Sequence, residues 1–133
     1  MKRSIMLYIF SIFMATDYTY ASDAFKCVVK DAKSAGVSGR LETDDFYNKF
    51  VGGKFTVDRK TGVMVGVLKN HEYYGAPKVL NYGSEKKAFR VITEYEPSVG
   101  FDYLTVATYN KKPQMPFIFI SSSTVVSGIC SDF

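Results

Sequence analysis

The sequence predicts a small, mainly β domain, built either as an antiparallel β-sandwich or as a partly open β-barrel of about eight short strands. Two observations lead to this prediction. Beyond residue 21, apolar and polar residues alternate with a period of two in several runs rich in β-branched and aromatic residues. Turn-forming residues separate these runs at intervals of about ten residues. Because no run in this part keeps the apolar period of a helix, we expect at most one short helix, near residues 44–50.

The first predicted strand covers Ala24 to Lys30 and carries Cys27. The run from Asp31 to Gly39 is polar and contains glycine, so we expect a loop there. A further short strand is predicted over 38–43.

A helix of one or two turns is predicted over 44–50. Thr43 or Asp44 supplies the side-chain oxygen that caps the start of a helix. Phe46 and Phe50 are four residues apart, so a helix would place both rings on one face.

A β-hairpin is predicted after this helix. Lys54 to Val57 and Val63 to Val67 both alternate, and a charged segment with a Thr-Gly pair separates them. Asp58 can accept hydrogen bonds from backbone N–H groups, and Gly62 tolerates a positive φ. The segment between the two strands is therefore interpreted as a type I turn with a glycine bulge.

The rest of the domain consists of strands separated by turns. These strands are predicted at 78–81, 88–95, 101–109, 117–120 and 125–130. Phe89 and Val91 share a face that we expect to be buried, whereas Arg90 and Glu94 lie on the opposite face. Phe117 to Ile120 is apolar on both faces, which predicts a central strand covered on both sides.

The start of the chain has the three-part order of a secretory signal peptide. Basic residues precede an apolar run from Ile5 to Ala15, and a short polar segment ends at the small residue Ala21. The apolar run is about half as long as a membrane-spanning helix requires. We therefore expect a signal peptide over 1–21 and a single β-rich domain over 22–133. After cleavage, the protein would have no membrane span and would be periplasmic or secreted.

The chain has two cysteines, Cys27 and Cys130, near the two ends of the predicted domain. In an oxidising compartment, such a pair is expected to form one structural disulfide. A redox-active pair would usually show C-x-x-C spacing, which is absent from this sequence.

The formal net charge of +4 does not indicate a nucleic-acid partner. Acidic and basic residues are interspersed along the chain, whereas nucleic-acid-binding proteins usually concentrate Lys and Arg on one face. We expect no nucleic-acid partner.

The sequence lacks a set of residues that would indicate catalysis. His71 is the only histidine, and the G-x-S-x-G, H-E-x-x-H, phosphate-loop and G-x-G-x-x-G motifs are absent. We therefore expect no catalytic residues, no metal site and no cofactor, and we interpret the protein as a non-enzyme.

The strongest candidate for a binding site is the loop that contains His71, Glu72, Tyr73 and Tyr74. Two adjacent tyrosines in a loop cannot both easily face the core, and loop tyrosines often contact partners. The leading hypothesis is an exported, non-catalytic binding domain that recognises another protein or an envelope component.

Two alternatives remain open. The first is a carrier of a small apolar ligand, with aromatic residues lining a barrel interior. Those residues would be Tyr95, Phe101, Tyr103 and Tyr109. The second is a carboxylate-dependent hydrolase that uses Glu42, Asp44 or Asp45 together with another acid.

Overall fold

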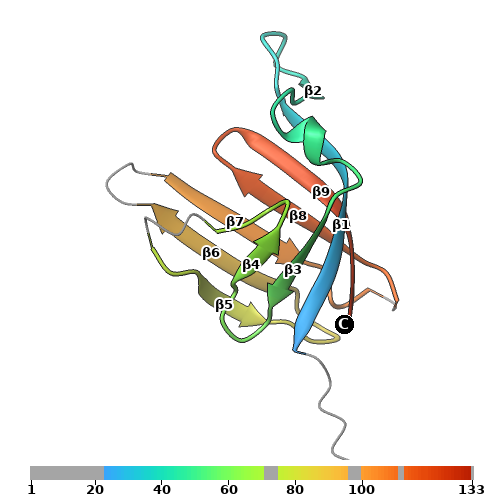
Figure 1. Cartoon of the computed structure of the whole chain (residues 1–133), viewed down its shortest axis with the longest axis vertical. Helices are drawn as coiled ribbons and strands as arrows, with labels where there is room; N and C mark the ends of the chain where they lie inside the picture. Colours follow the sequence, from blue (N-terminus) through green and yellow to red (C-terminus); the bar gives the residue numbers. More distant parts are fainter. Residues whose placement is uncertain (1–22, 71–74, 96–99, 111–112, 133) are drawn as a thin grey trace, which may run out of the picture.

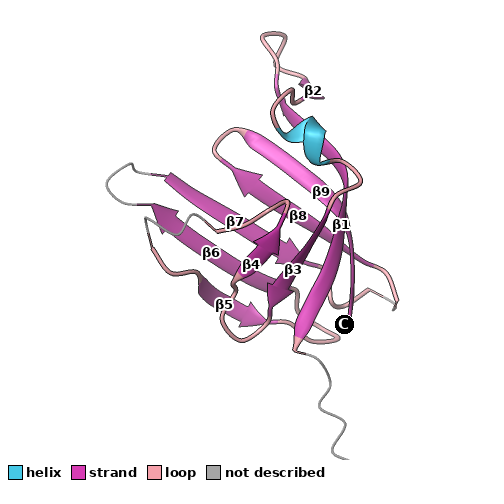
Figure 2. Cartoon of the chain, in the orientation of Figure 1, coloured by secondary structure: helices cyan, strands magenta, loops and turns pink. Residues whose placement is uncertain are grey.

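A computed structural model describes residues 23–70, 75–95, 100–110 and 113–132 of the chain. This part contains nine strands and one short 3-10 helix (Figure 2). The strands are β1 (Ala24–Ala35), β2 (Leu41–Thr43), β3 (Lys54–Asp58), β4 (Met64–Gly66), β5 (Lys78–Tyr82), β6 (Phe89–Tyr95), β7 (Gly100–Val106), β8 (Met115–Ser121) and β9 (Thr124–Asp132). The helix, η1, is Tyr47–Phe50. It confirms the prediction of a short helix near 44–50.

These strands form one antiparallel sheet, in the order β4-β3-β1-β9-β8-β7-β6-β5, with β2 paired to the end of β1. β5 to β9 form a meander, in which each strand pairs with the next. β1 pairs with β9, so the first and last strands meet in the middle of the sheet. The sheet is curled into a half-barrel (Figure 1). The mainly β fold class is confirmed, and the architecture fits the partly open barrel.

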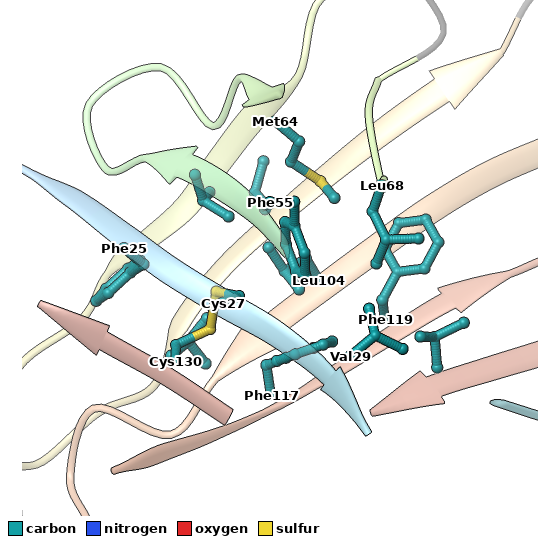
Figure 3. Close-up of a cluster of buried hydrophobic side chains, with 14 of the residues drawn as sticks. Phe25, Cys27, Val29, Phe55, Met64, Leu68, Leu104, Phe117, Phe119 and Cys130 are labelled. Atoms are coloured by element: carbon teal, nitrogen blue, oxygen red, sulfur yellow. A yellow bond between two sulfur atoms is a disulfide. The ribbon is translucent and has the colours of Figure 1, made fainter. Parts of the chain in front are cut away.

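The concave face of the curled sheet forms the hydrophobic core (Figure 3). Side chains from almost every strand point into it, among them Phe25, Val29, Phe55, Val57, Phe89, Val91, Leu104, Val106, Met115, Phe117, Phe119 and Val126. Phe25 on β1 packs edge-to-face on Phe89 of β6, with ring centroids 5.2 Å apart. Phe55 on β3 packs in the same way on Phe117 of β8, at 5.1 Å. Because neither pair lies on neighbouring strands, these contacts hold the sheet in its curled form.

The hairpin between β3 and β4 has the predicted turn. Asp58 Oδ1 accepts hydrogen bonds from the backbone N–H groups of Lys60 and Thr61, at 2.8 and 2.9 Å. Gly62 has a φ of 76°, which a residue with a side chain rarely adopts.

The same turn also closes the half-barrel against β5 and β6. Arg59 donates a hydrogen bond to the carbonyl oxygen of Tyr82 at 2.9 Å, and its guanidinium lies 4.8 Å from the Phe25 ring centroid. Gly62 packs so tightly on the Val91 side chain that an added Cβ would overlap it. The half-barrel is therefore closed here by contacts of the turn residues Arg59 and Gly62 with β5 and with the Val91 side chain.

The predicted loop over 31–39 is wrong in its first half, because β1 continues to Ala35. The pairing of β1 with β9 shifts between Val29 and Asp31, which is a β-bulge. The bulge leaves both Lys30 and Asp31 exposed and returns Ala32 to the core. Two adjacent charged residues can therefore lie inside a strand without entering the core.

The prediction that β8 is covered on both faces is also wrong. Phe117 and Phe119 face the core, but Ile118 on the convex face is 44% exposed. β6 follows its prediction, since Phe89 and Val91 are buried and Arg90 and Glu94 are exposed.

The predicted disulfide between Cys27 and Cys130 is confirmed. The two cysteines are directly paired across β1 and β9, and both are buried. A buried disulfide is compatible with a periplasmic or extracellular location.

We predict that Cys27→Ala/Cys130→Ala lowers the free energy of unfolding by about 2–4 kcal/mol, because the disulfide closes a long loop in the unfolded chain. The cysteines are 103 residues apart, and the entropy of closing a loop of about 100 residues sets a ceiling near 4.7 kcal/mol. Urea unfolding of oxidised wild type and the double variant measures the difference. Equal stabilities would contradict this role of the disulfide.

A second prediction concerns Gly128 on β9. A Cβ at this position would overlap the carbonyl oxygen of Val28 and lie 2.7 Å from the Phe117 ring. Because the backbone of β1 cannot move away, Gly128→Ala should cost about 1–3 kcal/mol of stability. Ser127→Ala, on the opposite face of the same strand, is the matched control and should change stability by less than about 0.5 kcal/mol. A Gly128→Ala variant as stable as this control would show that the packing is looser than described.

Candidate functional site

A pocket of about 190 Å³ opens where η1 meets one end of the sheet. We call it the mouth pocket. Its lining residues are Phe46, Tyr47, Phe50, Val67, Leu68, Lys69, Asp102 and Phe119. They come from η1 and the residue before it, the segment after β4, the start of β7 and the end of β8. The pocket is smaller than the roughly 300–1,000 Å³ typical of sites for drug-sized ligands.

The pocket lies where the inward-facing residues of the sheet change from apolar to polar. Phe89, Val106 and Phe117 form one row of paired residues across β6, β7 and β8, and Val91, Leu104 and Phe119 form the next. The third row is Thr93, Asp102 and Ser121. Smaller, polar side chains thus replace apolar ones at this end of the half-barrel.

Asp102 is the acidic group of this third row, and it is only 5% exposed. The Tyr95 hydroxyl donates a hydrogen bond to Asp102 Oδ2. Asn70 Nδ2 donates to Thr93 Oγ1 at 3.3 Å, while Asn70 Oδ1 accepts from the backbone N–H of Met64 at 2.6 Å. Because hydrogen bonds offset much of the cost of burying polar groups, the bond from Tyr95 helps to keep Asp102 beside an otherwise largely apolar pocket. The two bonds of Asn70 satisfy Thr93 of the same row separately.

The aromatic wall of the pocket is a cluster of three rings. Phe46, Tyr47 and Phe50 pack edge-to-face. The ring centroids are 5.1 Å apart for Phe46 and Tyr47, 6.0 Å for Phe46 and Phe50, and 5.8 Å for Tyr47 and Phe50. Phe46 is 61% exposed, and the Lys49 ammonium lies 4.0 Å from its ring centroid. The cluster therefore presents an aromatic edge to solvent directly beside the pocket.

Asp44 connects this cluster to the sheet through two hydrogen bonds. Its Oδ1 accepts a hydrogen bond from the Tyr47 backbone N–H at 2.7 Å, and its Oδ2 accepts from Thr124 Oγ1 at 3.1 Å. The bond from the Tyr47 backbone is the largest influence on the pKa of Asp44, and it lowers that pKa below the ordinary 3.8. Asp44, one of the two predicted caps, therefore joins η1 to the start of β9.

The predicted binding residues His71, Glu72, Tyr73 and Tyr74 lie outside the described residues. The residues on either side of them are described. Asn70 is bonded to Thr93 of β6, and an added Cβ on Gly75 would lie 2.7 Å from the Glu94 carbonyl oxygen. Both flanking residues thus lie against β6, close to the polar row beside the mouth pocket. A binding role for residues 71–74 stays a prediction.

The structure turns only one of the four predicted carrier-lining residues toward the inside of the half-barrel. Phe101 and Tyr109 are more than half exposed, and Tyr103 alternates with the buried Asp102 and Leu104. Tyr95 does reach inward, where it bonds Asp102. The prediction is wrong for Phe101 because strand β7 turns Asp102, Leu104 and Val106 toward the core. It is also wrong for Tyr109, which lies beyond the end of β7 and is 56% exposed.

The acids proposed for a hydrolase occupy different surroundings. Glu42 on β2 and Asp45 are exposed, whereas Asp44 is half-buried and bonded to backbone and hydroxyl donors. The lowered pKa of Asp44 works against a role as a general acid, which needs a pKa near the working pH.

Asp102 was not among the residues singled out from the sequence. The sequence did contain a signal for Asp102. This acid is spaced by two residues from Leu104, as Leu104 is from Val106, so the three side chains share one face of the strand. That spacing would have found Asp102 if the inward face of the strand had been known.

The described residues contain neither a metal-binding cluster nor a membrane-spanning helix. Within the described ranges, no cluster of three or more His, Cys, Asp or Glu side chains is arranged to hold a metal ion. Nor does any helix in that part of the chain have the length and apolar character to cross a membrane. Comparison with protein-family models, curated proteins and solved structures gave no match.

We predict that Asp44 stabilises the fold at neutral pH and loses this effect in acid. Because its pKa is lowered by folding, its contribution is present above the ordinary pKa of 3.8 and disappears as the pH falls below that value. Wild type should therefore be more stable than Asp44→Ala near pH 7, and the difference should shrink toward about pH 2. Urea unfolding of wild type and Asp44→Ala at several pH values across this range measures the difference in stability. Asp45→Ala, which removes the exposed neighbouring carboxylate, is the control. A difference between wild type and Asp44→Ala that does not vary with pH would contradict the assignment.

Proposed function

We propose that the protein is an exported, non-catalytic binding domain that recognises another protein or an envelope component through the mouth pocket. The observation that carries this proposal is the exposed Phe46 ring beside a small, largely apolar pocket. Exposed aromatic groups around a well-packed hollow are typical of the anchor positions of protein interfaces.

The size of the pocket favours one inserted side chain of a partner over a separate drug-sized ligand. Val67, Leu68 and Phe119 offer apolar contact for such a side chain, and Leu68 and Phe119 lie side by side in Figure 3. Asp102 and Lys69 add polar groups at the pocket wall. A tyrosine of the partner would match this combination, because its ring is apolar and its hydroxyl can hydrogen-bond.

The rigidity of the aromatic cluster also supports binding. Asp44 ties the backbone of η1 to Thr124 of β9, and Tyr47 and Phe50 pack against the core. A contact surface that is already ordered loses less entropy when a partner docks. The rings of the mouth pocket therefore suit recognition without a large rearrangement.

The surroundings of the acids favour binding over hydrolysis. Asp102 is buried and bonded to Tyr95, and Asp44 is held with a lowered pKa. The packed interior favours a partner at the mouth over a carried ligand, because Phe25, Phe89 and Phe117 fill the middle of the half-barrel. The disulfide and the predicted signal peptide over 1–21 support a periplasmic or secreted location.

We predict that Phe46→Ser weakens capture of the partner by roughly 30-fold, the effect expected of a central aromatic anchor. The oxidised mature protein is used as bait in envelope and culture-supernatant extracts, and captured proteins are identified by mass spectrometry. Tyr82→Ser is the matched control, because Tyr82 on β5 is an equally exposed aromatic residue away from the pocket. Tyr73→Ala/Tyr74→Ala tests the predicted loop separately.

A partner retained by wild type and Tyr82→Ser but lost by Phe46→Ser supports the proposal. If Phe46→Ser keeps every specific partner of the wild type, the mouth pocket is not the binding surface. If wild type captures no specific partner, the proposal of a protein-binding domain fails.

A further inference from the structure

A polar hollow lies on the outside of the half-barrel, beside the turn that joins β5 to β6. It has a volume of about 400 Å³, within the roughly 300–1,000 Å³ range of many ligand sites. We call it the basic hollow. Its lining residues are Asn81, Lys86, Lys87, Ala88, Arg90 and Tyr109. Three of these six residues are cations, and none is an acid.

Two paired strands and the turn between them bring these residues together. Asn81 of β5 is directly paired with Arg90 of β6. Arg90 lies in the same outward row of paired residues as the exposed Ile118 of β8. Lys86 and Lys87 are neighbours in the turn, and both are exposed. The cations of the turn and the guanidinium of the strand therefore line one hollow on the convex face.

Hydrogen bonds fix the backbone of this turn. The Ser84 hydroxyl oxygen accepts bonds from the backbone N–H groups of Lys86 and Lys87, at 3.1 and 3.0 Å. The hydroxyl of the buried Thr108 lies 2.8 and 2.7 Å from the carbonyl oxygens of Ser84 and Lys87. Tyr109 is the next residue in the chain, so this contact also places it beside the two lysines. A site whose backbone is already ordered loses less entropy when a ligand binds.

The cations of the basic hollow are available to a ligand. Within the described part of the chain, none of Lys86, Lys87 and Arg90 forms an ion pair. Glu85 lies in the same turn but does not line the hollow. All three cations are exposed, so a ligand can reach their N–H groups from solvent.

The hydrogen-bonding groups of the lining are mostly donors. Lysine and arginine side chains donate and cannot accept. Asn81 Oδ1 accepts a bond from the Gly83 N–H at 3.0 Å, which leaves the Asn81 amide NH₂ to donate. A matching ligand therefore has to offer several acceptors and negative charge.

A phosphate monoester has this chemistry. It carries about two negative charges at neutral pH and three strong acceptor oxygens. Arginine binds phosphate through two parallel hydrogen bonds, and lysine contributes a point charge. Three cations suit this dianion better than the single charge of a carboxylate.

Tyr109 indicates which group carries the phosphate. This residue lines the hollow and is 56% exposed. The C–H groups on one face of a sugar ring are apolar and pack well on an aromatic ring. The hydroxyl oxygens of the same sugar can accept hydrogen bonds from the Asn81 amide.

We propose that the basic hollow binds a sugar phosphate, with Arg90, Lys86 and Lys87 around the phosphate and Tyr109 against the sugar ring. The site is separate from the mouth pocket. The basic hollow lies on the convex face near the start of β6, whereas the mouth pocket lies where the inward rows of β6 and β7 become polar.

Isothermal titration calorimetry of the oxidised mature protein tests the proposal. The probe is mannose 6-phosphate, with mannose and inorganic phosphate as reference ligands. We expect saturable binding of mannose 6-phosphate, weaker binding of inorganic phosphate and no binding of mannose. Arg90→Gln should weaken binding of mannose 6-phosphate about 10- to 100-fold, the range expected when hydrogen bonds to a charged group are lost.

Arg40→Gln is the matched control, because Arg40 is an exposed arginine in the loop between β1 and β2. It should leave the affinity unchanged. Tyr109→Ser should weaken binding of mannose 6-phosphate and leave binding of inorganic phosphate unchanged. Thermal unfolding establishes that each variant is folded.

A free sugar phosphate and a phosphorylated sugar at the end of an envelope glycan share this chemistry. A mannose pentasaccharide with a terminal 6-phosphate distinguishes these two sources. Tighter binding of the pentasaccharide than of mannose 6-phosphate indicates a glycan, and equal or weaker binding indicates a free sugar phosphate.

Absence of saturable binding of mannose 6-phosphate would overturn the proposal. An unchanged affinity in Arg90→Gln would do the same, as would an equal loss in Arg40→Gln, which would show general charge attraction. Mannose binding as tight as that of mannose 6-phosphate would remove the phosphate from recognition. Equal effects of Tyr109→Ser on mannose 6-phosphate and on inorganic phosphate would exclude the contact with the sugar.

Discussion

The contacts of Phe25 with Phe89 and of Phe55 with Phe117 connect strands that share no backbone hydrogen bonds. A single sheet has to bury one face, and here it does so by curling until that face packs on itself. The other features of the structure depend on this closure. The convex face is left to solvent, as the 44% exposure of Ile118 on β8 shows. The ends of the strands form the rims of the half-barrel, and the mouth pocket lies at the rim where the inward rows become polar.

The local elements of the fold could be predicted from the sequence because their causes are local. Alternation located most strands, Asp58 and Gly62 identified the hairpin turn, and the positions of the cysteines indicated a disulfide. The extent of β1 could not be predicted in this way. Asp31 to Ser34 have the composition of a loop, and only their pairing with β9 beyond a bulge keeps them in a strand. The inward face of β7 could not be predicted either, because alternation defines two faces of a strand without showing which one is buried.

The candidate site was beyond sequence reasoning for a related reason. The mouth pocket takes residues from separate segments of the chain, so no short motif contains it.

We infer that the half-barrel is filled inside and open to ligands at its mouth. The most direct test is a titration of the methyl-labelled protein with phenol, a small mimic of a tyrosine side chain, followed by NMR. We expect saturable shifts at the methyl groups of Val67 and Leu68, which line the mouth pocket, and none at Val29 and Val57 in the core. Shifts at the core methyl groups, or no saturable shift at the mouth, would contradict it.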